Sequence, residues 1–124
     1  GDDQWESELV ASQYRLNKLE KARPAADGLI EWETAHRDLH QRLLSACQLP
    51  LLLQFCATLH DLSDRYRRLF LATRPLDRDV SQEHADIVAA TLERREDEAC
   101  QLLRMHIERT GNNVLVALMR KQPG

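Results

Sequence analysis

The feature that most constrains this chain is one long apolar stripe with helical spacing. After Pro50, apolar side chains recur at alternating steps of three and four residues, and the stripe consists of Leu52, Phe55, Leu59, Leu62, Tyr66 and Leu69. This period belongs to one face of an α-helix, because a strand would place apolar residues at every second position. We therefore expect a helix that starts near Pro50 and turns this stripe toward the core.

Few helix breakers interrupt the rest of the chain. Its 124 residues include only four Gly and four Pro, which lie between periodic segments or near the ends. We expect further helices at about 4–22, from after Gly28 to Cys47, at 79–94, and from 96 to a break at Gly111, followed by a short helix from Val114 to Lys121. The first helix has few apolar positions and is expected to be peripheral.

Shorter signals mark the connections between these helices. Pro24 is expected to end the first helix, Asp27 to cap the second, and Thr73–Asp77 to form a loop. No segment alternates apolar and polar residues for long enough to form a strand. The predicted fold class is therefore all-α, an antiparallel helical bundle with short connections.

Composition argues against several classes of protein. The net charge is −3, so direct binding of this segment to nucleic acid is not expected. The longest apolar run, Leu49–Leu53, is too short to span a membrane, and the acidic N-terminus does not resemble a signal peptide. The cysteines are odd in number and lack CxxC spacing, which predicts small buried side chains in a reducing cytoplasm; they are Cys47, Cys56 and Cys100.

Four of the five histidines have spacings that suggest a common site. His36 and His40 are four residues apart and therefore project from one helix face. His84 and His106 each lie eleven residues from a turn expected near Arg95, so an antiparallel hairpin places both at the same level, about 16 Å from that turn. These four residues predict a divalent metal site built from three helices, although the spacing equally allows hydrogen-bonded core histidines. His60 is expected at the core boundary, near a carboxylate, and not as a ligand.

Four segments of the chain, in order over about residues 29–110, resemble one known family. Residues 31–47 resemble the pattern D/N/H-x-x-F-H-x-x-L-x-x-A of the effector-binding (FCD) domains of FadR-subfamily GntR transcription regulators. Asp64–Leu69, Glu83–Ala90 and Leu103–Thr110 resemble that family's RYRRL, EH-x-x-I-x-x-A and L-x-x-H-I-x-x-T elements. The resemblance implies an all-α domain that binds a small carboxylate or sugar acid, in a cytoplasmic, dimeric transcription regulator.

The resemblance also implies a ligand set. Many members of the family hold a divalent metal with one Asp and three His, and His40, His84 and His106 match the three histidines. His36 stands where Asp is commonest, so the site would keep four ligands but lose its anionic one. Four imidazoles suit zinc or nickel, and the uncompensated charge of the metal would favour an anionic effector.

Partners follow from the same resemblance. Arg65 and Arg67 flank the stripe, and either could bind an effector carboxylate; the alternative is a solvated cationic cluster at the helix end. Glu31–Glu33 and Cys47 favour short dicarboxylates such as glutarate as effectors. We expect residues 1–124 to be an effector-binding and oligomerisation domain without its first helix, and to contact DNA only through a winged-helix domain absent from this chain.

Two other functions remain open at this stage. A metal-dependent enzyme would need a general base and an open coordination position. The chain has no HExxH motif and no activated serine or cysteine, so we do not expect an enzyme. A plain helical interaction module with structural histidines would bind no metal.

Overall fold

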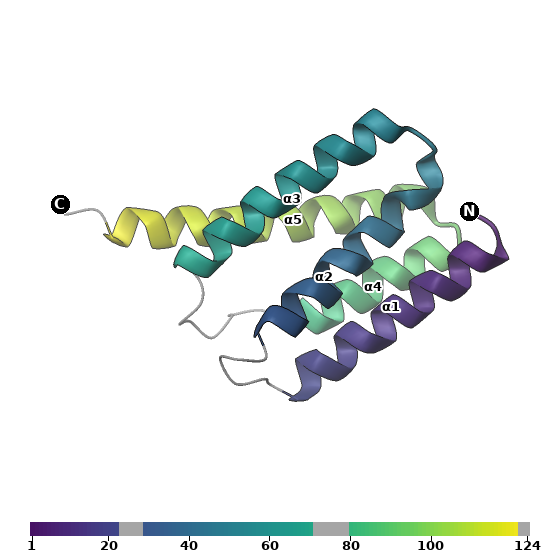
Figure 1. Ribbon diagram of the computed structural model, residues 1–124, viewed down its shortest axis with the longest axis horizontal. Helices are drawn as coiled ribbons and strands as arrows, with labels where there is room; N and C mark the ends of the chain where they lie inside the picture. The colour runs from purple at the N-terminus through teal and green to yellow at the C-terminus, as the bar shows by residue number, and fades with distance from the viewer. Residues whose placement is uncertain (23–28, 71–79, 122–124) are drawn as a thin grey trace.

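A computed structural model describes residues 1–22, 29–70 and 80–121. Consecutive helices run in opposite directions, and within these ranges every regular element is helical, which confirms the predicted all-α bundle (Figure 1). The elements are α1 (Asp3–Ala22), α2 (Leu29–Leu44) with a 3-10 turn at Ser45–Cys47, α3 (Pro50–Phe70), α4 (Val80–Leu92) and α5 (Glu96–Lys121). The expected signals at Pro24, Asp27 and Thr73–Asp77 lie outside the described residues.

The apolar core lies between α1, α2 and α4. Leu9 and Leu16 of α1 are 0% and 1% exposed, and they pack with Leu39 of α2 and Val88 of α4. The expectation that α1 is peripheral is therefore wrong. A narrow apolar stripe is enough to bury α1, because this helix lies against α2 and α4 at once. The indole N–H of Trp5 also donates a hydrogen bond to the Arg42 carbonyl at 2.7 Å.

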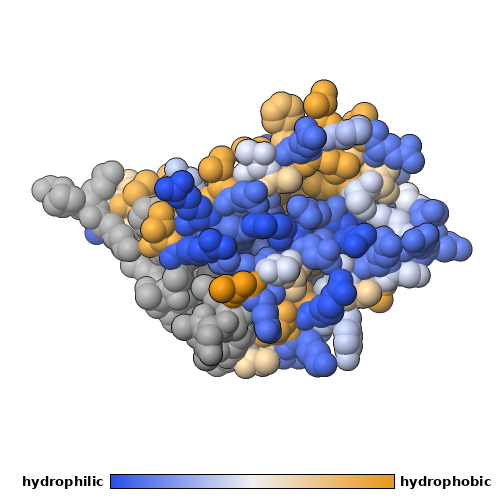
Figure 2. All heavy atoms as spheres, in the orientation of Figure 1, coloured by the Kyte–Doolittle hydropathy of each residue, from blue (hydrophilic) through white to orange (hydrophobic). Residues whose placement is uncertain are grey.

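The apolar stripe of α3 faces outward, so its predicted core position is also wrong. Phe55 and Leu59 are 67% and 63% exposed, and the other four stripe residues are exposed as well. Figure 2 shows apolar side chains gathered on the part of the surface that α3 forms. The opposite face of α3, which includes His60 and Asp64, packs toward α2. Spacing defined the stripe correctly but not the side on which it lies.

A tight turn joins α4 to α5 and sets their register. Arg94 has a left-handed backbone with φ 58, the Arg94 N–H donates to the Thr91 carbonyl at 3.1 Å, and the Arg95 N–H donates to the Ala90 carbonyl at 2.9 Å. This pair of bonds caps the C-terminus of α4. Ile87 and Ala90 lie on the inner face of α4 and are buried.

Helix α5 continues through the break expected at Gly111, and that prediction is wrong. Gly111 is exposed, and a side chain at its position would have no neighbour within 4 Å. Glycine in an exposed helix costs only about 1 kcal/mol, and Gly111 does not adopt the positive φ that would end the helix.

The expected burial of the cysteines is wrong too: Cys47 and Cys100 are exposed. No described helix is long and apolar enough to cross a membrane.

Candidate metal centre

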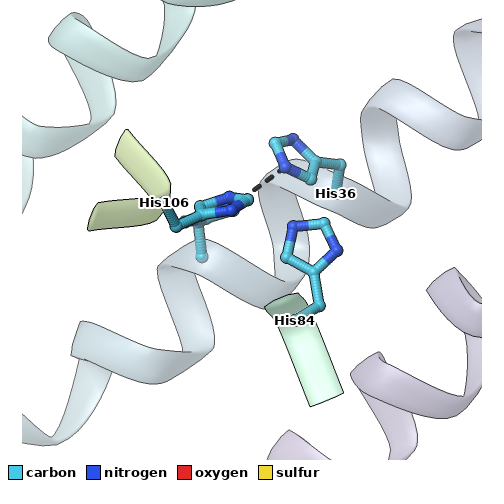
Figure 3. A group of neighbouring side chains, drawn as sticks. His36, His84 and His106 are labelled. Atoms are coloured by element: carbon cyan, nitrogen blue, oxygen red, sulfur yellow. Dashed lines mark hydrogen bonds between the residues drawn. The ribbon is translucent and has the colours of Figure 1, made fainter. Parts of the chain in front are cut away.

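Four histidines from three helices converge on one point of the bundle. His36 and His40 come from α2, His84 from α4 and His106 from α5, and one ring nitrogen of each lies within 4.8 Å of the others. Figure 3 shows the rings of His36, His84 and His106 directed toward one another. The structure therefore brings together the four residues that spacing had selected as metal ligands.

Each pair of histidines is positioned by simple helix geometry. His36 and His40 lie one turn apart, and their Nε2 atoms are 3.1 Å from each other. His84 and His106 face each other across the α4–α5 hairpin, with ring centroids 4.7 Å apart. His36, His84 and His106 are each at most 4% exposed. Asp38 turns to the other side of α2, where it accepts a hydrogen bond from Ser12 at 2.6 Å.

Two glutamates that the sequence analysis did not select support this cluster. Glu20 of α1 lies 3.0 Å from His84 Nδ1, and Glu83 of α4 lies 2.7 Å from His106 Nδ1. Helical spacing could have shown that both glutamates lie on inward faces. Glu20 follows Leu16 by one turn on the buried face of α1, and Glu83 precedes Ile87 by one turn on the buried face of α4. Glu83 points away from its sequence neighbour His84, because adjacent positions on a helix face different directions, and this direction brings it to His106.

The surroundings of the two α2 histidines favour their neutral form. The pKa of His36 lies well below 6.5, first because of burial and then because of the nearby His40 and Arg67. The pKa of His40 is also lowered well below 6.5, by burial and by the neighbouring His84 and His106. A neutral imidazole has a lone pair on one ring nitrogen, which is the form that binds a metal.

The donor set fits a divalent metal. His84 Nε2 is buried without a hydrogen-bond partner, which is costly for a polar atom unless something else binds there. A carboxylate on the far nitrogen of a histidine is the usual support of a metal-binding imidazole, because it fixes the tautomer and raises the basicity of the ring. Glu20 and Glu83 provide this support to His84 and His106. Zinc or nickel would suit four imidazoles at this position.

A second polar group lies beside the histidines, on the inner face of α3. Asp64 is 1% exposed and pairs with Arg67 and, at 2.9 Å, with Arg37 of α2. Arg67 also reaches His36, with its Nη1 atom 3.2 Å from Nδ1. Of the two arginines selected from the sequence, Arg67 therefore lies at the cluster, whereas Arg65 is exposed.

His60 lies nearer to the cluster than its sequence position indicated. Its ring centroid is 5.2 Å from that of His40, and its Nε2 atom is 3.7 Å from the Asp64 carboxylate. Burial and the charges of Arg67 and Arg37 lower the pKa of His60 to about 4. His36, His60 and Asp64 could also surround an ion, but the two guanidinium groups next to Asp64 disfavour a cation there.

A cavity of about 320 Å³ opens between α2 and α3 on one side of the histidines. His40 and His60 line it together with apolar side chains that include Leu44, Leu53 and Ala57. A small organic molecule in this space would have imidazoles on one side and an apolar wall on the other.

Comparison with known proteins agrees with this architecture. The sequence model of the FCD domain matches residues 2–109. The chain is 36% identical over 110 residues to the uncharacterized HTH-type transcriptional regulator BphR of Paraburkholderia xenovorans (strain LB400), which covers 87% of this chain and 45% of that protein. It is 32% identical over 111 residues to the HTH-type transcriptional repressor GlaR of Escherichia coli (strain K12), which covers 86% of this chain and 50% of that protein.

The chain thus spans about half the length of the curated relatives that it matches. No solved structure matches it significantly. The match to the family covers α1 to α4 and the part of α5 that carries His106, so it includes all four histidines of the cluster. This chain belongs to the FCD domain family.

Proposed function

We propose that this chain is the ligand-sensing domain of a GntR-type transcription regulator of the FadR subfamily, and not an enzyme. It binds a small carboxylate effector at a divalent metal held by His36, His40, His84 and His106. The observation that carries the proposal is the convergence of these four imidazoles, two of them supported by glutamates on their far nitrogens. DNA binding belongs to a separate winged-helix part of the regulator, and the protein acts in the cytoplasm.

When bound, the metal would supply a positive centre that attracts the effector carboxylate. The chain contributes a second cation, because Arg67 stands next to His36 and can turn its guanidinium group toward an anion. The adjoining cavity has room for a short acid, and its apolar side chains fit the carbon chain of that acid. A monocarboxylate or a short dicarboxylate such as glutarate is the class of effector that we propose.

The decisive experiment combines metal analysis with ligand screening. The protein is purified without a chelator or a nickel column, its metal content is measured, and its thermal stability is recorded with a series of short carboxylates. Metal at about one equivalent, together with stabilisation by an acid only when metal is present, would support the sensor. Metal with turnover of the acid would support an enzyme instead, and the absence of metal would support a structural module.

The apolar spacing of α3 is that of one helix of a coiled coil, which supports a homodimer. Its six exposed stripe residues follow the three-four spacing with which two helices pack along their length. Such a continuous apolar surface is unusual on a monomer and is typical of an interface. We propose that α3 packs against α3 of a second copy.

Sedimentation of the chain tests this interface. Leu59→Lys places a charge in the middle of the stripe and should convert the dimer to a monomer. Gln54→Lys adds the same charge on the same helix, at an exposed position off the stripe, and should leave the dimer intact. A wild-type chain that sediments as a monomer at high concentration would rule out this interface.

A further inference from the structure

The histidines of the cluster differ in what contacts their outer nitrogens. His84 and His106 each present Nδ1 to a glutamate, at 3.0 and 2.7 Å. A carboxylate only accepts hydrogen bonds, so Nδ1 must carry the proton in both rings. With the proton on Nδ1, the neutral form of each ring has its lone pair on Nε2, which is the tautomer that a metal requires there.

His36 has the opposite arrangement. Its Nδ1 atom lies 3.2 Å from Nη1 of Arg67, and a guanidinium group only donates hydrogen bonds. A ring nitrogen that accepts a hydrogen bond carries no proton, so His36 Nδ1 holds a lone pair in this contact. With Nδ1 accepting, the proton must lie on Nε2, from which it is donated to His40 Nε2 at 3.1 Å. That proton occupies the direction in which His36 would bind a metal.

Several contacts hold Arg67 in this position. Its guanidinium group lies 5.5 Å from the centre of the Trp32 ring, in a cation–π arrangement. The Trp32 ring stacks on His36, with centroids 4.7 Å apart and an angle of 11°. Arg67 also pairs with Asp64, which is buried and is held in turn by Arg37. Trp32 and Asp64 therefore both hold the guanidinium group of Arg67 next to His36.

We infer that Arg67 keeps His36 out of the metal coordination until the arginine turns away. His40, His84 and His106 then form the initial ligand set, and one position stays open for an anion such as the effector carboxylate. His36 can bind only after its proton has moved from Nε2 to Nδ1, which requires an acceptor in place of the guanidinium group. This inference rests on the proposed metal site and refines it: three of its four histidines bind the metal first, and His36 joins them only after Arg67 has moved. Arg67 is thereby a positioning residue of the site.

The metal-free protein offers a test that needs no variant. Long-range proton–nitrogen NMR spectra distinguish the two tautomers of a neutral histidine. His36 is expected with its proton on Nε2, and His84 and His106 with theirs on Nδ1. A His36 ring protonated on Nδ1 would overturn the inference, whatever the protein does with metal.

Zinc titration provides the second test, with a matched pair of variants. R67Q replaces the guanidinium group by an amide whose oxygen can accept from His36 Nδ1. R68Q removes the same charge one residue further on, from an exposed arginine that pairs with Glu33. Zinc is expected to shift the ring signals of three histidines in the wild type and in R68Q, but of four in R67Q. The zinc affinity of R67Q should rise by about tenfold, and that of R68Q should stay within about twofold of the wild type.

The outcomes distinguish the role of Arg67 from the existence of the metal site. Four coordinated histidines in the wild type, or three in R67Q, would overturn the role of Arg67 and leave the metal site standing. Failure of zinc to bind the wild type and both variants would overturn the metal site and this inference with it. H36D adds a further check, since one carboxylate oxygen can accept from Arg67 while the other binds zinc, and this variant should bind zinc through four residues with Arg67 in place.

Discussion

The two sides of this bundle are held together by different kinds of contact. Helices α1, α2 and α4 share a conventional apolar core around Leu9, Leu39 and Val88. Helix α3 contributes no buried apolar side chain among the described residues, and the fully buried residue on its inner face is Asp64. Its apolar side chains lie outside (Figure 2). Apolar packing holds the first side together, whereas α3 is held to α2 by polar contacts on its inner face.

The inner face of α3 explains this division. Leu53, Ala57, His60, Asp64 and Arg67 follow the same three-four spacing as the outer stripe, shifted around the helix. They face the histidines and the cavity, so this face serves the site. A helix with two periodic faces can place either one inside, and here the polar face lies against the bundle because it has charged and imidazole partners there.

The largest expected difference between the two sides is in stability. Leu39→Ala removes a side chain that is 0% exposed and should lower the free energy of unfolding by about 2–5 kcal/mol. Leu59→Ala, on the outer stripe, should cost less than about 1 kcal/mol when measured on monomeric protein. Urea unfolding of both variants at low protein concentration measures the difference.

Protein concentration supplies the control for this pair. The cost of Leu59→Ala should increase at concentrations where the proposed α3 interface would form and cover the outer stripe, whereas the cost of Leu39→Ala should stay nearly constant. Equal costs for the two substitutions in the monomer would contradict the placement of the stripe on the outside.

Much of the fold could be predicted because local signals determine it. Pro50 marked the start of α3, and the scarcity of helix breakers and of alternating segments predicted the all-α class. What failed depends on neighbours that are distant in sequence. The burial of α1 is set by α2 and α4 on either side of it, and the outward direction of the α3 stripe is set by the charged partners of Asp64.

The same distinction applies to the candidate site. The convergence of the four histidines followed from one helical repeat and one symmetric hairpin, both local features. Glu20 could not be paired with His84 from spacing, because the two residues lie 64 positions apart on helices whose packing the sequence does not fix. The contact between Arg67 and His36 likewise depends on how α3 lies against α2. The site also differs in charge from the expectation, since Glu20 and Glu83 lie against its histidines and would partly balance a metal ion held there.

Among the histidines, the substitution of His84 should have the largest effect on metal binding. His84→Ala removes a buried ligand with a prepared tautomer and should weaken zinc binding by at least about 100-fold. His60→Ala removes a histidine beside the cluster and should change zinc affinity by less than about threefold. Competition with a chromophoric chelator measures both. A similar loss in the two variants would place His60 among the ligands.

Removal of a supporting carboxylate should have a smaller effect. Glu83→Gln keeps the shape of the side chain but weakens the contact with His106 Nδ1, so zinc affinity should fall by about tenfold. Glu93→Gln is the matched control, because Glu93 is exposed and pairs with Arg95 at the α4–α5 turn. Calorimetric zinc titration distinguishes the two variants, and unchanged affinity in Glu83→Gln would show that His106 needs no carboxylate.

The smallest expected effect concerns the polar face of α3 at acidic pH. His60 has a pKa of about 4 in the folded chain, against about 6.5 when unfolded. Above pH 6.5 both states are neutral and the shift contributes nothing. Between pH 6.5 and 4 the unfolded chain binds a proton that the folded chain does not, so stability falls as the pH falls.

Replacement of His60 by glutamine removes this one titration. The metal-free wild type should lose free energy of unfolding between pH 7.5 and 5.5. In His60→Gln this loss should be smaller by about 1 kcal/mol, after allowance for the partial exposure of His60. Some loss should persist in the variant, because His36 and His40 also have lowered pKa values. Urea unfolding at the two pH values measures it. An identical pH dependence in wild type and variant would mean that His60 is solvated in the folded chain, and that α3 lies less closely against the histidines than its inner face indicates.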